Sequence, residues 1–340
     1  MSAASALPSV VRQFRLAARP DGLPKESDFK LEQAPLPEPQ AGEALVKTVY
    51  LSVDPYMRGR ITGVRTYADP VNIGEVIVGG DVGQVIESRA PNLQPGDFVA
   101  GYWGWQDHAV ASASWLQKLD PQIAPVSTAL GVLGMPGMTA YFGFLDICQP
   151  KAGETVVVSG AAGAVGSLAG QIAKIQGCRV VGIAGGDGKI RHMIEELGLD
   201  AGFNYKNTPD YAAKLKELCP SGIDCYFDNV GGAISDAVFT LLNSFGRVSV
   251  CGQISQYNLA KPELGPRLLG QILVKQLKVE GFIVTRFQQR WPEGMAQMAR
   301  WIREGKLRYR EDIVEGFENT PRAFIDMLEG RNIGKMLVKA

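Results

Sequence analysis

Histidine is scarce in this sequence, and cysteine never occurs as a metal-binding pair. The two histidines, His108 and His192, lie far apart, and neither has a cysteine neighbour. The five cysteines are odd in number, and none belongs to a Cys-x-x-Cys motif. These absences argue against a disulfide framework and against a thiolate metal site. We therefore expect a protein of a reducing compartment, the cytoplasm, that holds no metal.

The sequence also lacks an excess of charge of either sign. Lysine and arginine number 35, as do aspartate and glutamate, so no net field draws the chain toward nucleic acid or an acidic membrane. One uncharged stretch, between Asp120 and Asp146, is long enough to span a bilayer. Its prolines and glycines disfavour a continuous helix in lipid, and we predict a buried segment at a domain junction. We expect neither nucleic acid nor membrane as a partner.

The chain has 340 residues, which is longer than one hydrophobic core usually supports, so we predict two domains. Hydrophobic residues make up 46% of the chain. Short strand-like segments broken by proline and glycine fill roughly the first third of the chain and indicate a mostly β domain. Later, strand and helix patterns alternate, which predicts a parallel, doubly wound α/β sheet. The predicted strands are 155–159, 179–184, 202–205, 224–228, 247–251 and 278–283. The domain boundaries are predicted at 1–132, 133–309 and 310–340, the last part returning to the β domain.

A glycine-rich segment, "VVVSGAAGAVGSLAGQIAKIQG", follows the first of these strands at 156–177. Gly160, Gly163 and Gly166 occupy the turn and the start of an amphipathic helix. Glycines allow a tight turn and a close ligand, and a helix amino terminus points N–H groups at it, which suits a pyrophosphate. The spacing departs from the usual G-x-G-x-x-G because Ala161 stands at one glycine position. Close packing of helix on strand remains the alternative explanation of these glycines.

The end of the next strand indicates which dinucleotide binds. An NAD site usually has Asp or Glu there, about 20 residues after the glycines, to bind the ribose 2′-hydroxyl. Here Gly185 and Gly186 stand at the tip, followed by Asp187, Lys189 and Arg191. A tip without its own carboxylate, beside two cations, favours a 2′-phosphate and therefore NADP(H). Lys189 is the predicted contact, and a solvated lysine on a helix face is the alternative.

Six separate motifs resemble those of the zinc-independent medium-chain dehydrogenase/reductases. Besides the glycine-rich segment they are "DPYMRGR" at 54–60, "GMPGMTAYFG" at 134–143, "FDNVGG" at 227–232, "CGQISQYN" at 251–258 and "NIGKMLVKA" at 332–340. They are most similar to the leukotriene B4 dehydrogenase / prostaglandin reductase branch, with its plant alkenal double-bond reductases and bacterial curcumin reductase. The resemblance implies a GroES-like catalytic domain, a Rossmann domain binding NADPH, and a homodimer. It also implies reduction of the double bond of a small enone or enal.

The resemblance extends to individual residues. With the glycine motif, the implied cofactor-binding residues are Gly160, Gly163, Ala164, Val165, Gly166, Gly185, Lys189, Tyr205, Asn229, Cys251, Phe282, Ile283, Val284 and Asn332, with Met135 and Thr139 near the nicotinamide. Each has an alternative reading in which it only packs a strand, serves a turn or ends a helix.

The chemistry must proceed without zinc, because "VDPYMR" stands where zinc relatives carry a metal-binding cysteine. Hydride addition to the β-carbon of an enone places negative charge on the carbonyl oxygen, which a positioned hydrogen-bond donor can stabilise. A neutral phenol can donate that bond and can also supply a proton to the enolate. Tyr257 matches the family tyrosine given that role, and Tyr56 is a second candidate, in the substrate pocket. Two alternatives remain open, an NADPH quinone reductase and a crystallin-like protein that binds NADPH without catalysis.

Overall fold

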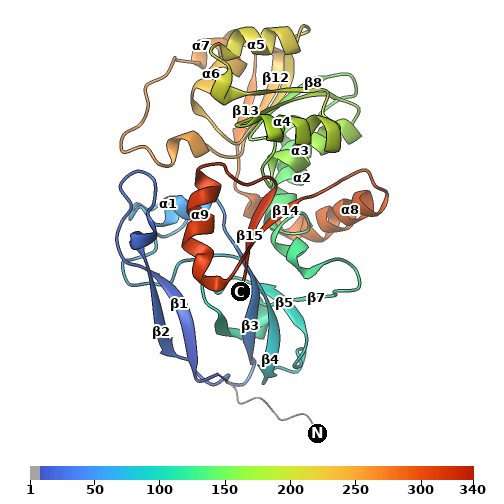
Figure 1. Ribbon diagram of the computed structural model, residues 1–340. Coiled ribbons are helices and arrows are strands. Elements are labelled where there is room, and N and C mark those ends of the chain that lie inside the picture. The colour runs from blue at the N-terminus through green and yellow to red at the C-terminus, as the bar shows by residue number, and fades with distance from the viewer. Residues whose placement is uncertain (1–7) are drawn as a thin grey trace. The chain divides into compact units, whose positions relative to one another are not determined.

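The chain, described over residues 8–340 by a computed structural model, separates into two units (Figure 1). The first holds the chain up to Leu130, Ile313–Arg331 and Met336–Ala340, and the second holds Gly131–Asp312 and Asn332–Lys335. The chain therefore leaves the first unit, builds the second and returns. As boundaries of independently folding domains, 1–132, 133–309 and 310–340 stay a prediction, and residues 1–7 of the first lie outside the described residues.

The first unit is mostly β structure, as the broken strand pattern predicts. Its strands are β1 (Val10–Leu16), β2 (Phe29–Pro35), β3 (Glu43–Ser52), β4 (Asp81–Ser88), β5 (Phe98–Gly101), β6 (His108–Ser112) and β7 (Gln117–Leu119), with β14 (Glu311–Glu315) and β15 (Lys335–Lys339) from the end of the chain. Two helices, α1 (Tyr56–Arg60) and α9 (Thr320–Leu328), accompany four 3₁₀ turns at Glu26–Asp28, Ala113–Trp115, Val126–Leu130 and Phe317–Asn319.

Most of these strands form one sheet. Its order is β14-β15-β3-β4-β5-β7, with β6 also paired to β3, while β1 and β2 form a separate antiparallel pair. Trp105 is fully buried between the rings of Phe29 and Phe324, with centroids 5.2 and 5.8 Å away. This aromatic side chain is therefore part of the hydrophobic core.

The second unit is a six-stranded parallel sheet wrapped by helices, and the predicted α/β class is confirmed. The strands are β8 (Thr155–Ser159), β9 (Arg179–Ala184), β10 (Ala201–Asn204), β11 (Ile223–Asp228), β12 (Leu242–Val250) and β13 (Lys278–Gly281), in the order β10-β9-β8-β11-β12-β13. The helices are α2 (Met135–Cys148), α3 (Gly166–Ile175), α4 (Asp187–Arg191), α5 (Tyr211–Leu218), α6 (Gly232–Leu241), α7 (Leu269–Val274) and α8 (Trp291–Arg303). Shorter turns are the π-helix His192–Glu196 and the 3₁₀ helices Tyr205–Asn207, Ile254–Gln256 and Val284–Arg290.

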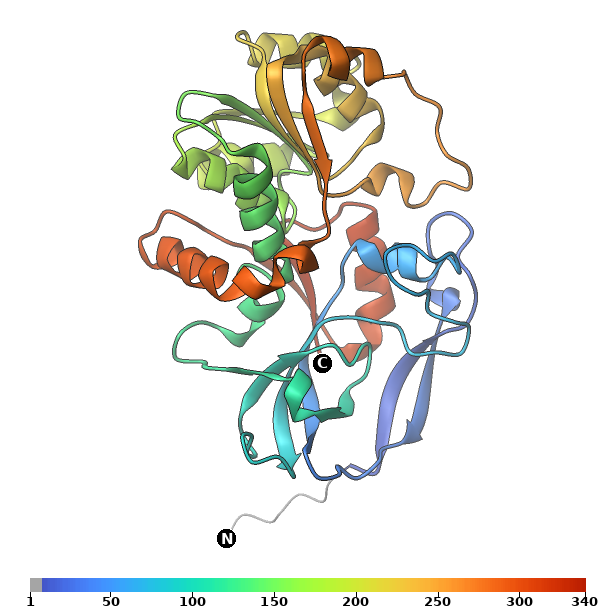
Figure 2. The ribbon, with the colours of Figure 1, turned by 180° about the vertical axis from the view of Figure 1, so that it is seen from behind.

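Both faces of this sheet are buried, which explains why β8 is a continuous apolar run. Val156 and Val158 belong to a core cluster with Phe144 of α2 and Leu168 of α3. Val157, which points to the other face, belongs to a second cluster with residues of α5 and α6. The two layers of helices can be followed in Figures 1 and 2. The strand order turns back between β8 and β11, and ligands of such sheets bind at that point, outside the carboxyl ends of the strands.

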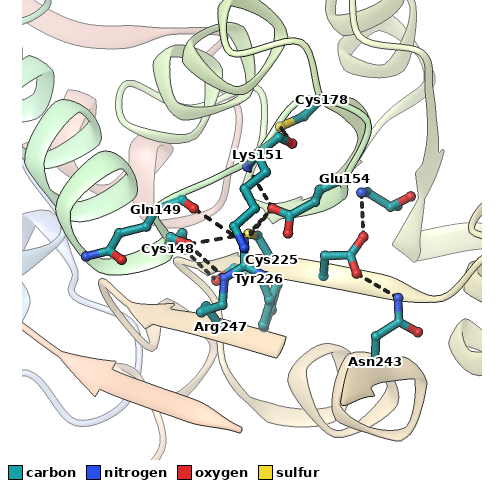
Figure 3. Close-up of polar contacts among 11 residues, drawn as sticks. Cys148, Gln149, Lys151, Glu154, Cys178, Cys225, Tyr226, Asn243 and Arg247 are labelled. Carbon is teal, nitrogen blue, oxygen red and sulfur yellow. Dashed lines mark hydrogen bonds and ion pairs between the residues drawn. The ribbon is translucent and has the colours of Figure 1, made fainter. Parts of the chain in front are cut away.

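The opposite, amino-terminal side of the sheet is held by an ion pair between Arg247 of β12 and Glu154, which precedes β8 (Figure 3). The Arg247 Nε also donates to the carbonyl oxygen of Cys148, at 2.8 Å. A Glu154 carboxylate oxygen accepts from the backbone N–H of Lys151, at 2.8 Å. This group of contacts joins the end of α2 to the first and fifth strands in chain order.

The uncharged stretch between Asp120 and Asp146 is only partly buried. Phe142 and Phe144 of α2 are fully inaccessible, as predicted. The prediction is wrong for Ile123, which is 69% exposed in a turn that Asp120 closes by accepting the backbone N–H of Gln122. Among residues 8–340, no helix combines the length and the apolar character that crossing a membrane requires.

Candidate cofactor and substrate site

A predicted site residue directly follows each of the six parallel strands. Gly160 follows β8, Gly185 follows β9, Tyr205 follows β10, Asn229 follows β11, Cys251 follows β12 and Phe282 follows β13. Carboxyl ends of parallel strands share one edge of a sheet, so residues far apart in the sequence lie along a single rim. We call this edge the carboxyl rim.

The turn after β8 needs its glycines for two separate reasons. Gly160 has a φ of 62°, in the left-handed region that favours glycine. A Cβ atom on Gly166 would lie 2.3 Å from the carbonyl oxygen of Gly160, so helix α3 can approach the turn only without a side chain there. Ala161, which departs from the usual motif, is fully buried, and its N–H donates to the Ile183 carbonyl at 3.0 Å. Its methyl group is therefore part of the core.

Three consecutive backbone N–H groups at the start of α3 are available to a ligand. Gly163 and Ser167 use theirs within the turn, donating to the carbonyls of Gly160 and Gly163, each at 3.0 Å. The N–H groups of Ala164, Val165 and Gly166 donate to no acceptor among residues 8–340. Such donors at a helix amino terminus suit a pyrophosphate. The residues present therefore fit the phosphates of a dinucleotide.

Gly185 and Tyr205 meet at the tips of β9 and β10. A Cβ atom on Gly185 would lie 2.8 Å from a ring carbon of Tyr205 and 2.9 Å from its hydroxyl oxygen. Burial raises the pKa of the Tyr205 phenol, with a further contribution from Tyr211. The hydroxyl therefore stays protonated at neutral pH and can donate a hydrogen bond.

Lys189, on α4, is affected by the charge of a second lysine, Lys206, which was not among the predicted site residues. Partial burial lowers the pKa of Lys189, and the charge of Lys206 lowers it further, while Asp312 acts in the opposite direction. Lys206 directly follows Tyr205 and is exposed. A lysine next to a predicted phosphate ligand was the signal that could have identified it.

Asp187 is the acid nearest to this strand tip in the sequence, and its side chain is already bonded. One carboxylate oxygen accepts from the amides of Asn204 and Asn207, at 2.8 and 3.4 Å. These bonds also tie the start of α4 to the segment after β10. The carboxylate near this tip is therefore bonded to two amides, and two lysines lie in the same region of the chain. An NAD site instead has a free carboxylate there.

Asn229 is held against the glycine turn. Its backbone N–H donates to the Ser159 hydroxyl at 2.9 Å, and its amide donates to the Ser159 carbonyl at 2.7 Å. A Cβ atom added to Gly160 would lie 3.4 Å from the Cβ atom of Asn229. This segment is oriented by Asp228, which was not among the predicted site residues and is 3% exposed. The carboxylate of Asp228 accepts from Ser159, Tyr226, Ser235 and the backbone N–H groups of Val230 and Gly231.

Tyr257 lies in a loop that is bonded to the loop after β11. The backbone N–H of Cys251 donates to the Asp228 carbonyl at 2.8 Å, and that of Ile254 donates to the Asn229 carbonyl at 3.2 Å. The hydroxyl oxygen of Tyr257 accepts from the backbone N–H of Gln253 at 3.3 Å. Burial raises the pKa of Tyr257, and the Gln253 bond partly opposes the shift. The phenol is therefore neutral at neutral pH, and its hydrogen remains available to a ligand.

The remaining residues of the β12 and β13 ends are more buried. Burial raises the pKa of the Cys251 thiol to about 12, which keeps it neutral. Phe282 and Val284 belong to the core, and the Phe282 ring fills the space where Gly143 of α2 has no side chain. Ile283 is 43% exposed.

Asn332 reaches the glycine turn from the end of the chain. Its amide donates to the carbonyl of Gly334 at 2.8 Å, and the N–H of Gly334 donates to the carbonyl of Ala162 at 2.8 Å. Met135 and Thr139 occupy the first turns of α2, where the Thr139 hydroxyl donates to the Met135 carbonyl at 2.7 Å.

Tyr56 belongs to the first unit, where it begins helix α1. Burial raises the pKa of its phenol well above the usual range, and the charge of Asp54 adds to the effect. The two tyrosines predicted to be catalytic therefore come from different units, and both are neutral at neutral pH.

Metal-ligating side chains are dispersed. No group of three His, Cys, Asp or Glu residues that could hold a metal ion occurs within residues 8–340. His192 is 5% exposed, and its Nδ1 lies 3.0 Å from a carboxylate oxygen of Glu196.

Comparisons with known proteins extend over both units. A family model for the N-terminal domain of oxidoreductase matches residues 12–119, and one for zinc-binding dehydrogenase matches residues 164–300. The chain is 47% identical to the NADPH-dependent curcumin reductase of Escherichia coli, covering 96% of each chain. It is 43% identical to an NADP(+)-dependent 2-alkenal reductase of Nicotiana tabacum, covering 93% and 94%. The crystal structure of CurA from Vibrio vulnificus in complex with NADPH superposes with a TM-score of 0.93 at 48% identity, covering 97% and 99%.

Proposed function

The chain belongs to the medium-chain dehydrogenase/reductases, in the zinc-independent branch of the curcumin and alkenal reductases, and on that premise we propose that it is an ene reductase. It uses NADPH to reduce the carbon–carbon double bond of α,β-unsaturated aldehydes and ketones. The proposal rests on Tyr257, a phenol kept neutral by burial in a loop bonded to the end of β11, and on three backbone N–H groups at the turn after β8 that have no acceptor in the described part of the chain.

NADPH is the coenzyme of this reaction, and the carboxyl rim has matching groups for its parts. The N–H groups of Ala164, Val165 and Gly166 bind the pyrophosphate, and Lys189 and Tyr205 bind the adenosine 2′-phosphate. The other predicted residues along the rim line the rest of the cofactor. When bound, NADPH supplies the hydride that adds to the β-carbon of the alkene.

Tyr257 acts on the substrate carbonyl. As the β-carbon gains a hydride, the electron pair of the double bond moves toward the carbonyl oxygen and an enolate forms. A proton from the Tyr257 hydroxyl or from water then joins the α-carbon, and the carbonyl is restored. The Tyr257 hydroxyl, which already accepts the Gln253 N–H, donates its own hydrogen to that oxygen and stabilises the enolate. Tyr56 contributes to the pocket that holds the substrate.

The test is consumption of NADPH, followed by its ultraviolet absorbance, with enals, enones and quinones as separate substrates. We expect turnover of enals and enones with NADPH. When NADH replaces NADPH, turnover of the same substrates should be much lower. Turnover with quinones alone would instead identify a quinone reductase. Protection of the fold by NADPH without turnover of any substrate would identify a binding protein without catalysis.

No metal takes part in the proposed mechanism. The two histidines are far apart in the sequence, and His192 is paired with Glu196. Dialysis against a strong chelator should leave enone turnover unchanged. Loss of activity, with recovery on addition of zinc, would contradict the assignment.

We also propose a homodimer in the cytoplasm. Strand β13 is an edge of the sheet, as Figures 1 and 2 show, and it exposes Val279. Leu269 and Leu273 of the neighbouring segment α7 are 79% and 77% exposed, which is unusual for leucines of a monomer. Sedimentation of the purified protein tests the dimer, with a Leu273→Lys variant expected to shift it toward monomer.

The five cysteines are free thiols, which fits a reducing compartment.

A further inference from the structure

The segment after β10 is fastened to the start of α4 by side-chain hydrogen bonds. Asn204 accepts the backbone N–H of Lys206 at 3.1 Å and donates to Asp187 at 2.8 Å. Asn207 donates to the same Asp187 oxygen at 3.4 Å. The 3₁₀ turn Tyr205–Asn207 therefore keeps a defined position beside α4, which carries Lys189.

This arrangement holds two ammonium groups of the same sign within electrostatic reach of each other. Lys206 lowers the pKa of Lys189, which is the effect of a like charge nearby. The side chain of Lys206 forms no ion pair with any of residues 8–340. Two cations that repel each other are both stabilised when a dianion lies between them.

We propose that Lys206 is a second cation for the adenosine 2′-phosphate, and that it contributes to the preference for NADPH over NADH. The inference rests on the proposed cofactor site, and it adds a residue to which no role had been given. The Asp187 bonds to Asn204 and Asn207 support it, because they fix the turn that carries Lys206 against the start of α4, which carries Lys189.

The experiment measures equilibrium binding of NADPH and NADH, by fluorescence titration without substrate, for the wild type and for Lys206→Ala. We expect the dissociation constant of NADPH to rise about three- to tenfold, with that of NADH changed less than about twofold. Lys206→Arg should retain most of the NADPH affinity. Lys216→Ala, an exposed lysine on α5 of the same unit, is the matched control and should change neither constant.

Salt provides a second readout. Because an exposed charge is screened, the NADPH difference between wild type and Lys206→Ala should shrink as ionic strength rises. An equal loss for both coenzymes, or no loss for NADPH, would overturn the inference. Lys189→Ala measured in parallel separates the two proposals. If only Lys189→Ala lowers NADPH affinity, Lys206 is excluded and the phosphate site stands. If neither does, both assignments at this tip are wrong.

Discussion

The ring of Tyr205 lies so close to Gly185 that no other residue type fits at position 185 without displacing it. The two residues follow neighbouring strands, β9 and β10, and the strand tips are joined through the bonds of Asp187 to Asn204 and Asn207. A glycine at this tip therefore has a stereochemical purpose besides the omission of a carboxylate. It makes room for a phenol beside the proposed 2′-phosphate.

Gly185→Ala should weaken NADPH binding by about tenfold, because a methyl group 2.8 Å from the ring forces Tyr205 to move. NADH binding should change less. The matched control is Gly188→Ala on α4, where a Cβ atom would contact nothing within 4 Å. Coenzyme titration of both variants tests the idea, and equal affinities for the two variants would show that the Tyr205 position has no influence on the cofactor.

The strands could be predicted where apolar runs end at glycine or a turn. The bounds predicted for β8 and β9 agree with the structure, since "TVVVS" and "RVVGIA" are apolar and flanked by turn residues. The predicted strand 247–251 begins five residues too late, because β12 starts at Leu242. Residues 242–246, "LNSFG", have low strand propensity, and pairing of Leu242 with Ile223 of β11 extends the strand nevertheless.

The site could be predicted only as far as local motifs reach. The glycine turn, Lys189 and Tyr257 stand in recognisable segments, and their position on the carboxyl rim follows from the parallel sheet. The approach of Lys206 to Lys189 and the bonds around Asp187 depend on side chains from separate elements. The burial of Phe282 follows from Gly143 on α2, which no strand pattern indicates.

Tyr257→Phe should reduce enone turnover on the order of a hundredfold or more, because the enolate loses a positioned donor. NADPH affinity should stay within about twofold, since the phenol acts on the substrate. The measurements are the turnover number with a saturating enone and the NADPH dissociation constant. Tyr141→Phe on α2 is a control expected to keep full turnover. A Tyr257→Phe enzyme with normal turnover would remove this residue from the mechanism.

Arg247→Met should lower the free energy of unfolding by about 1–3 kcal/mol, because Glu154 would keep a mostly buried charge without its partner. The pair lies on the amino-terminal side of the sheet, so NADPH affinity should not change. Urea denaturation measures the effect. Adding Glu154→Gln to the variant should recover part of the loss, and Lys214→Met, which breaks an exposed pair on α5, should cost much less. A loss of equal size in the two single variants would refute the buried-pair explanation.

Tyr226 should make the fold sensitive to alkali. The side chain is fully buried, and burial, followed by the charge of Asp228, raises the pKa of its phenol well above the ordinary value of 10.0. At a pH below the ordinary value of 10.0, the phenol is protonated in both the native and the unfolded state, so the stabilising effect of burial is fully present. As the pH rises above it, the unfolded chain ionises while the native state does not, and the free energy of unfolding falls.

Tyr226→Phe should therefore reduce the slope of stability against pH above about 10, although other buried tyrosines keep part of it. At neutral pH the variant should be less stable by about 1 kcal/mol, because Asp228 loses the hydroxyl that donates to it at 2.8 Å. Denaturant titrations at pH values from neutral to alkaline supply both numbers. A variant that is less stable at neutral pH but has an unchanged alkaline slope would contradict this account. It would show that the proton binding of Tyr226 does not differ between the native and unfolded states.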